Sequence, residues 1–351
     1  MSQPGNATLR LAVAGAGLIG RRHIALIQAS GSCQLSAIVD PGHHHRAIAE
    51  DLGVPDFASL EELFASGRPD GVIVATPNAV HVKNGLECLA NDVPVLVEKP
   101  IADSVEDGCR LAEAAKTAAA PLLVGHHRRH SPLLATARTV VQDGVLGPIV
   151  TVLGSALYYK PDDYFTAAPW RSQPGGGPIL INLIHAIDDL RSLCGEISSV
   201  RAVASNATRG FAVEDTVAIL LSFTDGGLGT FLLSDTAASP LSWEQTSGED
   251  PHYPRYADED CYVIAGTRGS LGVPTMRLKT YSGPGSWWTP FEDQTIEVER
   301  ADPLERQLEH FCAVILGEAE PLVTGSDALQ TLRVTLSIAE AARTGQPVVT
   351  G

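Results

Sequence analysis

Long apolar runs are absent from this sequence of 351 residues. A membrane-spanning helix needs ~20 consecutive apolar residues, and no segment approaches that length. The N-terminus has no basic region followed by an apolar block, because glycines interrupt residues 9–20, and a secretory signal is therefore not expected. We expect a cytoplasmic protein that does not act at a membrane.

Cysteine is scarce and scattered along the chain. The six cysteines form no Cys-x-x-Cys pair and no cluster with histidine. Isolated cysteines in a chain of this size are typical of reduced, mostly buried side chains. This pattern argues against a disulfide framework and against a structural zinc, and we expect no metal site.

Positive charge is also in short supply. The chain has 25 Lys and Arg against 41 Asp and Glu, which gives a net charge of −16. Such a surface repels phosphates and argues against nucleic acid or an anionic membrane as a partner. The 44% of hydrophobic and 19% of charged residues are typical of a soluble globular protein, and the length favours two domains.

The first pattern with a chemical meaning is a glycine-rich turn. A short apolar run is followed by Gly15, Gly17 and Gly20 in G-x-G-x-x-G spacing, with Leu18 and Ile19 between the last two. A strand, a turn and a helix N-terminus in this order present backbone N–H groups and a positive dipole end to a pyrophosphate. The three glycines permit the turn, the approach of phosphates and close helix–strand packing, respectively. A glycine-rich turn without a ligand is the alternative.

An acidic residue follows at the distance that a dinucleotide site requires. Residues 34–39 form a second strand pattern that ends in Asp40, twenty residues after Gly20. A carboxylate there accepts hydrogen bonds from the adenosine ribose and repels a 2′-phosphate. The sequence therefore predicts NAD rather than NADP, although Arg46 and the histidines at 43–45 soften that preference.

Strand and helix patterns alternate through the first third of the chain. Apolar runs that suit parallel strands covered on both faces recur at residues 71–75, 93–97 and 122–125, with helical patterns between them. This alternation predicts a doubly wound parallel sheet, the Rossmann arrangement, over residues 1–127.

The pattern changes after about residue 126. Longer, alternating runs favour an open, mostly antiparallel sheet with helices on one face. These runs are residues 149–157, 200–205, 216–223, 229–234 and 261–265. We therefore predict an α/β protein whose second, α+β domain covers residues 128–351, with an apolar helix over 178–193 and a long acidic loop over 236–260.

Lys99 is the first candidate for chemistry. It follows the run 93–97, and open α/β sheets bind ligands beyond the carboxyl ends of their strands. Pro100 biases Lys99 towards an extended backbone that carries the side chain out of the strand end. A cation there can bond a substrate hydroxyl and lower its pKa. The alternative is a surface lysine paired with Glu98.

A histidine and an acid share one face of the second-domain helix. His185 and Asp188 are at positions i and i+3, so the carboxylate can orient the imidazole and stabilise its cation. This arrangement suits a general base, and a core histidine satisfied by a neighbouring acid is the alternative.

Two further features precede that helix. Three consecutive glycines, residues 175–177, let a ligand or another backbone come close. Trp170 and Arg171 stand just before them, and the guanidinium suits a hydroxyl, a carboxylate or a surface acid.

In combination, these motifs resemble the glucose–fructose oxidoreductase/inositol dehydrogenase/MocA (Gfo/Idh/MocA) family. The resemblance covers nearly the whole chain, and the Glu-Lys-Pro element together with the glycine-rich His-x-x-Asp helix is specific to that family. The motifs in chain order are G-x-G-x-x-G, Ala75-Thr-Pro-Asn78 with His81, Glu98-Lys99-Pro100, Trp170-Arg171, the triple glycine, His185-x-x-Asp188, Leu322-Val-Thr-Gly325 and Gly345-Gln-Pro-Val348.

The resemblance implies a Rossmann domain followed by an α/β domain whose open sheet mediates oligomers, so we expect a homodimer or homotetramer. It also implies hydride transfer between a nicotinamide and a hydroxyl-bearing carbon, usually of a sugar or polyol. Lys99 would hold the reacting hydroxyl and His185 would act as general acid/base. The residues implied along the cofactor are Thr76, Asn78, His81, Glu98 and Lys99, with Glu98 near its ribose.

This chain departs from the family pattern at Ile181. Family members often place an aspartate there, four residues before the histidine. Asn182 is adjacent and can hydrogen-bond a substrate, but it cannot relay a proton at neutral pH. The stretch His126-His127-Arg128-Arg129 also differs from the commoner apolar-then-Arg pattern. It would put extra donors, His127 and Arg128 among them, beside a polyhydroxylated or acidic substrate.

Three functions remain open at this point. The first is an NAD-dependent dehydrogenase acting on a secondary alcohol of a sugar, inositol or related polyol. The second is a dihydrodiol dehydrogenase of the same fold, with an aromatic pocket lined by Trp243, Tyr253, Trp287 and Trp288. The third, which the missing aspartate suggests, is an NAD-binding sensor or partner protein without turnover.

Overall fold

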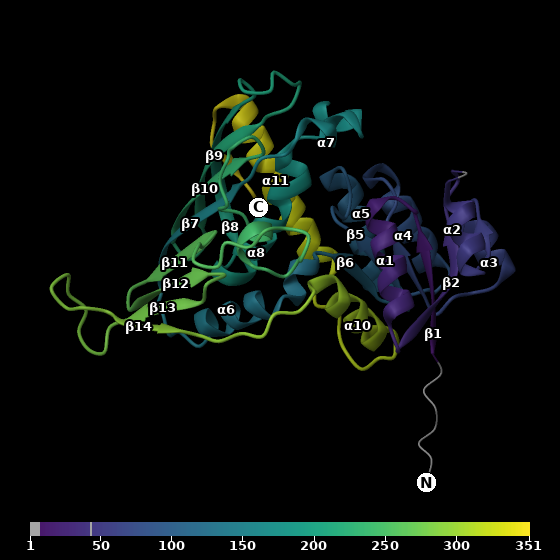
Figure 1. Cartoon of the computed structure of the whole chain (residues 1–351), viewed down its shortest axis with the longest axis horizontal. Coiled ribbons are helices and arrows are strands. Elements are labelled where there is room, and N and C mark those ends of the chain that lie inside the picture. The colour runs from purple at the N-terminus through teal and green to yellow at the C-terminus, as the bar shows by residue number, and fades with distance from the viewer. Residues whose placement is uncertain (1–7, 43) are drawn as a thin grey trace, which may run out of the picture. The chain divides into compact units, whose positions relative to one another are not determined.

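The protein is described by a computed structural model that covers residues 8–42 and 44–351. The chain divides into two compact units. Unit 1 contains the chain up to His127 together with Leu304–Leu332, and unit 2 contains Arg128–Pro303 and Arg333–Gly351. The elements of both units are labelled in Figure 1. No helix in the described ranges has both the length and the apolarity needed to cross a membrane.

Unit 1 is built on a six-stranded parallel sheet in the order β3-β2-β1-β4-β5-β6. The strands are β1 Leu9–Ala14, β2 Cys33–Val39, β3 Asp56–Phe57, β4 Gly71–Val74, β5 Val95–Glu98 and β6 Leu122–Gly125. Every residue of β4, β5 and β6 is buried, as expected for strands covered on both faces. The predicted doubly wound sheet is confirmed.

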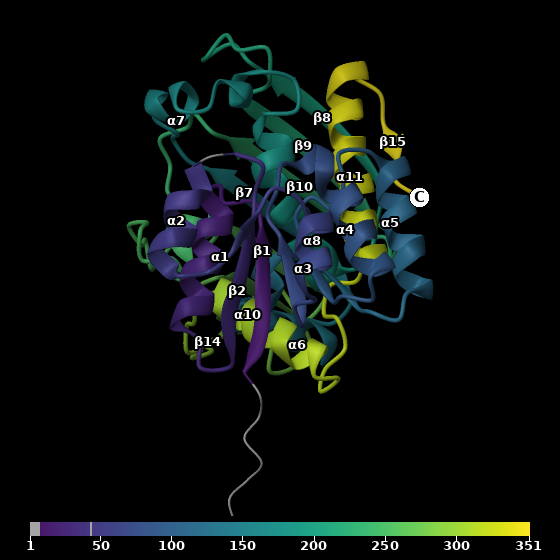
Figure 2. The same ribbon diagram turned by 90° about the vertical axis from the view of Figure 1, so that its right-hand side faces the viewer.

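The helices of unit 1 lie along this sheet, and Figure 2 shows α1 beside β1 and β2. They are α1 Leu18–Ala29, α2 His44–Leu52, α3 Leu60–Ser66, α4 His81–Ala90 and α5 Val105–Thr117, with 3-10 turns at Asn78–Val80 and His127–His130. Helices α3 and α5 begin after Ser59 and Ser104, whose hydroxyls accept the backbone N–H three residues on. Acidic residues in both first turns add a favourable interaction with the helix dipole.

A late segment of the chain returns to complete unit 1. Helix α10, Pro303–Ile315, buries Phe311 completely in the same apolar cluster as Leu11 and Ile73. Gly71 on β4 leaves room for this helix, because a Cβ there would lie 2.7 Å from the end of the Ile315 side chain. The predicted boundary at residue 127 assigned this segment to the second domain, whereas Leu304–Leu332 belong to unit 1.

Unit 2 contains a nine-stranded sheet in the order β14-β13-β12-β11-β7-β10-β9-β8-β15. Most neighbours are antiparallel, whereas β7 and β10 pair in parallel. The strands are β7 Ile149–Leu157, β8 Ile197–Ser205, β9 Thr216–Phe223, β10 Leu228–Ser234, β11 Tyr262–Gly266, β12 Gly269–Val273, β13 Arg277–Thr280, β14 Glu292–Thr295 and β15 Val348–Val349. The predicted open, mostly antiparallel sheet is confirmed.

One face of this sheet is covered by helices. Residues from α6 and α8 and from the C-terminal part of α11 share one apolar core with the inward side chains of the strands. The helices of unit 2 are α6 Pro132–Gln142, α7 Asp162–Thr166, α8 Ile184–Cys194 and α9 Trp243–Thr246, with a 3-10 turn at Pro169–Ser172. Helix α11, Gly325–Thr344, begins in unit 1 and ends in unit 2. The helix predicted over 178–193 begins as a π-helical segment, Ile179–Leu183, before α8.

The other face of the sheet carries exposed apolar side chains. Burial alternates along β9 and β10, so every second residue points away from the core. The outward residues include Leu153 on β7, Val203 on β8, Leu220 on β9, and Leu228 and Leu232 on β10, each at least half exposed.

Candidate functional site

The glycine-rich turn of unit 1 has the geometry of a phosphate site. Gly15 has φ +93°, and a Cβ on Gly20 would lie 1.9 Å from the Gly15 carbonyl oxygen, so both positions require glycine. A Cβ on Gly17 would meet nothing within 4 Å, and Gly17 provides no side chain to cap α1. Leu18 is 78% exposed at the start of the helix. The open helix N-terminus therefore fits the pyrophosphate of a dinucleotide.

Asp40 lies against this turn. Its Oδ2 accepts the N–H of Ala16 at 2.8 Å and its Oδ1 accepts the N–H of Gly42 at 2.8 Å. The carboxylate is thus held beside the glycines at the carboxyl end of β2, where a ribose hydroxyl would donate to it. Nε of Arg46 lies 3.6 Å from Oδ2 of Asp56. His43 and the side chains of His44 and His45 lie outside the part of the chain that the structure describes, so their predicted effect on cofactor preference stays a prediction.

Glu98, at the end of β5, is buried and holds α1 to the sheet. Its Oε1 lies 2.7 Å from Nε2 of His23 on α1, and its Oε2 accepts the N–H of Lys99 at 3.2 Å. Burial alone would raise the pKa of Glu98. The His23 hydrogen bond and the charges of His23, His127 and Lys99 outweigh burial and hold the pKa of this carboxyl below its usual value. Glu98 is therefore an anion beside Lys99.

His81 links the two loops that follow β4 and β5. The side chain is buried, with Nε2 2.7 Å from the Thr76 carbonyl oxygen and Nδ1 2.8 Å from the Pro100 carbonyl oxygen. The Thr76 hydroxyl in turn accepts from Asn84 at 3.1 Å. His81 therefore fixes both Thr76 and the Lys99–Pro100 peptide, which is cis. Asn78 is exposed in the 3-10 turn between Thr76 and His81.

The predicted cofactor residues consequently gather at one edge of the unit 1 sheet. The glycine turn follows β1, Asp40 follows β2, Thr76 follows β4 and Lys99 follows β5. Lys99 is half-buried. Carboxyl ends of adjacent parallel strands form the ligand edge in open α/β sheets, so this unit fits a dinucleotide. Within the described ranges, no three His, Cys, Asp or Glu side chains are placed to hold a metal ion.

In unit 2, α8 carries the predicted catalytic pair, His185 and Asp188. His185 is 8% exposed and Asp188 is 1% exposed. Asp188 Oδ1 accepts from Nη1 of Arg129 at 3.3 Å, so a cation compensates its charge. The orientation of His185 by Asp188 stays a prediction.

Arg128, predicted to contact substrate, lies in a buried ionic cluster. Its Nη1 donates to Asp189 Oδ2 at 3.1 Å, its Nη2 bonds Glu244, and its guanidinium carbon lies 5.6 Å from the centre of the Trp243 ring. Tyr262 also donates to Asp189, at 2.9 Å. Burial raises the pKa of Asp189 to about 6 despite the opposing charge of Arg128. The cluster ties α8 and α9 to the 3-10 turn that holds Arg128.

The acidic 236–260 loop is anchored by a second buried acid. Glu249 accepts from the Ser131 hydroxyl and, at 3.1 Å, from Nε1 of Trp243. Burial raises the pKa of Glu249 to about 7, and these two hydrogen bonds oppose that rise. Trp243 is thus a core side chain, whereas Trp287 and Trp288 are 89% and 85% exposed. Of the four aromatic residues proposed to share a pocket, Tyr253 lines a cavity in unit 2, and the three tryptophans are not among the residues that line it.

A cavity of about 670 Å³ lies in unit 2. Five tyrosines, Lys160 and Asn182 are among its lining residues. Lys160 Nζ donates to Asn182 Oδ1 at 2.7 Å and lies 4.7 Å from the centre of the Tyr164 ring. Burial, with help from Arg171 and Arg209, lowers the pKa of Lys160 to about 8 against the opposing attraction of Asp235.

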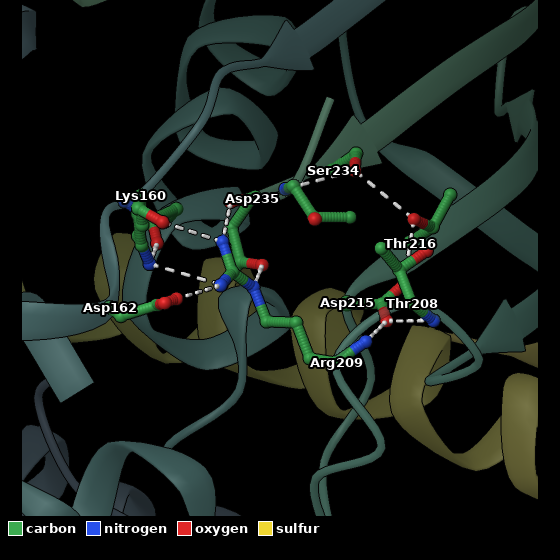
Figure 3. Close-up of polar contacts among 10 residues, drawn as sticks. Lys160, Asp162, Thr208, Arg209, Asp215, Thr216, Ser234 and Asp235 are labelled. Carbon is green, nitrogen blue, oxygen red and sulfur yellow. Dashed lines mark hydrogen bonds and ion pairs between the residues drawn. The ribbon is translucent and has the colours of Figure 1, made fainter. Parts of the chain in front are cut away.

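Sequence reasoning missed Lys160. Its only local signal is its place three residues beyond the alternating run 149–157, since Asn182 and Asp235 are distant in the chain. Figure 3 shows Lys160, Asp162 and Asp235 arranged around Arg209. Arg209 donates to the carbonyl oxygen of Lys160 at 2.7 Å and to Asp235 Oδ1 at 3.1 Å, which fixes the chain just after β7.

Trp170 and Arg171 occupy the 3-10 turn before the glycines. Trp170 is 55% exposed. The guanidinium carbon of Arg171 lies 3.8 Å from the centre of the Tyr164 ring, and its Nη1 donates to the Tyr164 carbonyl oxygen at 2.7 Å. A Cβ on Gly176 would lie 2.3 Å from the Trp170 carbonyl oxygen, and one on Gly177 would lie 2.3 Å from Glu214. These two glycines therefore accommodate the protein's own backbone and side chains.

Comparison with known proteins gives consistent matches across both units. Residues 9–126 match the family described as an oxidoreductase family with an NAD-binding Rossmann fold, and residues 134–272 match the GFO/IDH/MocA C-terminal domain. The chain is 27% identical to the rhizopine catabolism protein MocA of Rhizobium meliloti, covering 95% of this chain and 93% of the relative. It is 28% identical to the 1,5-anhydro-D-fructose reductase of Ensifer adhaerens (94% and 96% covered) and 26% identical to the NAD⁺-dependent scyllo-inositol 2-dehydrogenase of Bacillus subtilis (97% and 96%).

Solved structures agree on the fold. An oxidoreductase from Agrobacterium radiobacter, crystallised with NAD⁺, L-tartaric acid and magnesium, superposes with a TM-score of 0.81 at 21% identity, covering 98% of this chain and 99% of the other. The WlbA dehydrogenase of Bordetella pertussis, in complex with NADH and UDP-GlcNAcA, gives a TM-score of 0.79 at 24% identity with the same coverage.

Proposed function

The chain belongs to the Gfo/Idh/MocA family of NAD-binding oxidoreductases, and from that premise we propose that it is an NAD-dependent dehydrogenase acting on a secondary alcohol of a sugar, inositol or related polyol. The observation that carries this proposal is the edge of the unit 1 sheet, where the glycine turn, Asp40 and Lys99 follow neighbouring strands. The names of the similar proteins, among them inositol dehydrogenases and an anhydrosugar reductase, support an alcohol–carbonyl conversion on a sugar-like molecule.

In the proposed mechanism, NAD supplies the hydride acceptor. The N-terminus of α1 would hold the pyrophosphate of NAD, and Asp40 would hold its adenosine ribose. As the family resemblance implies, Lys99 would donate a hydrogen bond to the reacting hydroxyl and lower its pKa, and His185 would take the hydroxyl proton. Glu98 places a negative charge beside Lys99, and His81 holds the Lys99–Pro100 peptide in place.

Ile181 stands where family members often have an aspartate, but a polar side chain remains in the same helix turn. Asn182 is next to it, and its Oδ1 accepts a hydrogen bond from the buried Lys160. An amide cannot exchange a proton at neutral pH, so we assign proton transfer in this chain to Lys99 and His185. Retention of Lys99, His185 and Asp188 favours an enzyme over a silent NAD-binding protein.

The test is NADH formation by the purified chain with NAD⁺ and a panel of inositols, aldoses, anhydrosugars, sugar acids and an aromatic cis-dihydrodiol. We expect activity on at least one sugar or polyol that disappears in a Lys99→Ala enzyme. Activity confined to the dihydrodiol would replace the substrate class, and silence across the panel with NADH binding intact would favour the sensor.

Asp40 sets the expected preference for NAD. In Asp40→Ser, we expect kcat/KM with NAD to fall about 10-fold, since a charged acceptor for the ribose is lost. The value with NADP should rise, because the carboxylate no longer repels a 2′-phosphate. Steady-state kinetics with both cofactors measure this.

Asp70→Ser is the matched control for this variant. Asp70 also accepts a backbone N–H, from Arg10 at 2.6 Å, but at the opposite end of β1. It should leave the NAD/NADP ratio unchanged. An unchanged ratio in Asp40→Ser as well would remove Asp40 from cofactor selection.

We also propose that a second copy of this chain covers the outward face of the unit 2 sheet. Apolar side chains are exposed on four adjacent strands, at Leu153, Val203, Leu220, Leu228 and Leu232. Exposed apolar side chains gathered on one sheet face are typical of subunit interfaces. A homodimer or homotetramer built through this face is the expected assembly.

A further inference from the structure

The cavity beside Lys160 combines aromatic walls with few charged groups. Its tyrosines are Tyr158, Tyr159, Tyr164, Tyr253 and Tyr256, and its charged residues are Lys160 and Glu244. Tyrosine presents an apolar ring face and a polar tip, which together suit the C–H faces and hydroxyls of a sugar ring. A volume of about 670 Å³ is within the range of small-molecule pockets.

Lys160 is an incompletely compensated cation. Its Nζ donates to Asn182 Oδ1 and lies 3.6 Å from Asp235 Oδ2. The other oxygen of Asp235 accepts from Arg209, so one carboxylate serves two cations. Arg171 and Arg209 both oppose the charge of Lys160. An ammonium has three N–H donors, so Lys160 retains capacity for a ligand acceptor.

Tyr158 also lines this cavity. Its hydroxyl oxygen is buried and has no hydrogen-bond partner within residues 8–42 and 44–351. The Tyr158 ring lies 5.6 Å from Lys160 Nζ. Burial raises the pKa of Tyr158 well above its usual value, so the hydroxyl keeps its proton. A buried hydroxyl without a partner costs free energy, which a ligand acceptor would recover.

We propose that this cavity binds the carboxylate of an anionic sugar, with Lys160 Nζ and Tyr158 Oη as its donors. The proposal rests on the dehydrogenase function above and narrows its substrate to sugar acids. A singly charged carboxylate suits the site better than a phosphate dianion, because Asp235 lies beside Lys160 and Glu244 lines the wall. Glu244 is paired with Arg128 and leaves Lys160 as the lining cation.

The test compares two ligands that differ only at the charged group, D-glucuronate and D-glucose. The wild-type chain is titrated with each in the presence of NADH by calorimetry, and both are also assayed as substrates with NAD⁺. We expect glucuronate to bind more tightly. Lys160→Met should raise its Kd and KM about 10- to 100-fold, the loss expected for a charged hydrogen bond, with little change in kcat. Glucose binding should not change.

Two further variants keep the test decisive. Lys279→Met removes a half-exposed lysine of unit 2 paired with Asp293, and it should leave both ligands unaffected. Tyr158→Phe removes only a hydroxyl and tests the same site if Lys160→Met does not fold. It should weaken glucuronate binding by a smaller factor than the loss of the lysine. An unchanged Kd for glucuronate in a folded Lys160→Met or Tyr158→Phe overturns the proposal.

Failure of the proposed dehydrogenase activity can be distinguished from failure of the proposed carboxylate site. Lys99-dependent oxidation of neutral polyols, without binding of glucuronate, would sustain the dehydrogenase and overturn the carboxylate site. Lys160-dependent binding of glucuronate, without oxidation of any panel member, would sustain the carboxylate site and overturn the dehydrogenase.

Discussion

Lys99→Ala is expected to lower kcat about 10²- to 10⁴-fold, the range typical of losing a group that assists proton transfer. The side chain follows β5 at the carboxyl edge of the unit 1 sheet, beside the anionic Glu98. Without the ammonium, the reacting hydroxyl loses the cation that lowers its pKa and the donor that positions it. Turnover of the best substrate in the panel, measured at saturating NAD⁺, gives the effect.

The control is a second lysine of the same unit. Lys116 on α5 is exposed and pairs with Glu113 at 2.6 Å, so Lys116→Ala should retain wild-type turnover. NADH binding, followed by fluorescence, should persist in Lys99→Ala because the glycine turn and Asp40 are untouched. Wild-type turnover in Lys99→Ala would show that Lys99 takes no part in the reaction.

The cofactor half of the site was predictable because its signals are local. Gly15 and Gly20 are dictated by close contacts within one strand–turn–helix, and Asp40 follows the next strand. The position of Lys99 was predictable for the same reason, since a strand end marks the ligand edge of a parallel sheet, and its role stays a prediction. The two sheets were likewise predicted correctly, because runs buried on both faces and alternating runs produce different sequence patterns.

The contacts that define unit 2 were not predictable in this way. Arg128 meets Asp189 and Glu244 across separations of 61 and 116 residues, and no short pattern records such partners. Lys160 reaches Asn182 only because β7 ends near the π-helical segment. The inclusion of α10 in unit 1 depends on Phe311 filling an apolar cluster that the sequence alone does not position.

Arg128→Met is expected to lower the free energy of unfolding of unit 2 by about 3–5 kcal/mol, as is typical when one partner of a buried ion pair is removed. Methionine keeps much of the apolar stem that packs near Trp243 but leaves Asp189 and Glu244 without their cation. Asp189 is fully buried, so its charge would have to be neutralised by a proton or reached by water. Thermal and urea unfolding, followed by tryptophan fluorescence, measure the loss.

The ionic origin of this loss can be separated from the loss of packing. Asp189→Asn removes the buried negative charge, so adding it to Arg128→Met should recover part of the stability, a non-additivity expected for contacting residues. Arg343→Met, which removes an exposed guanidinium of unit 2 paired with Glu340, is the matched control and should unfold like the wild type. If Arg128→Met alone matched that control, the cluster would contribute little to stability, and the substrate contact predicted for Arg128 would be the better account of a buried guanidinium. If the double variant recovered stability while losing turnover, Arg128 would serve both the fold and the site.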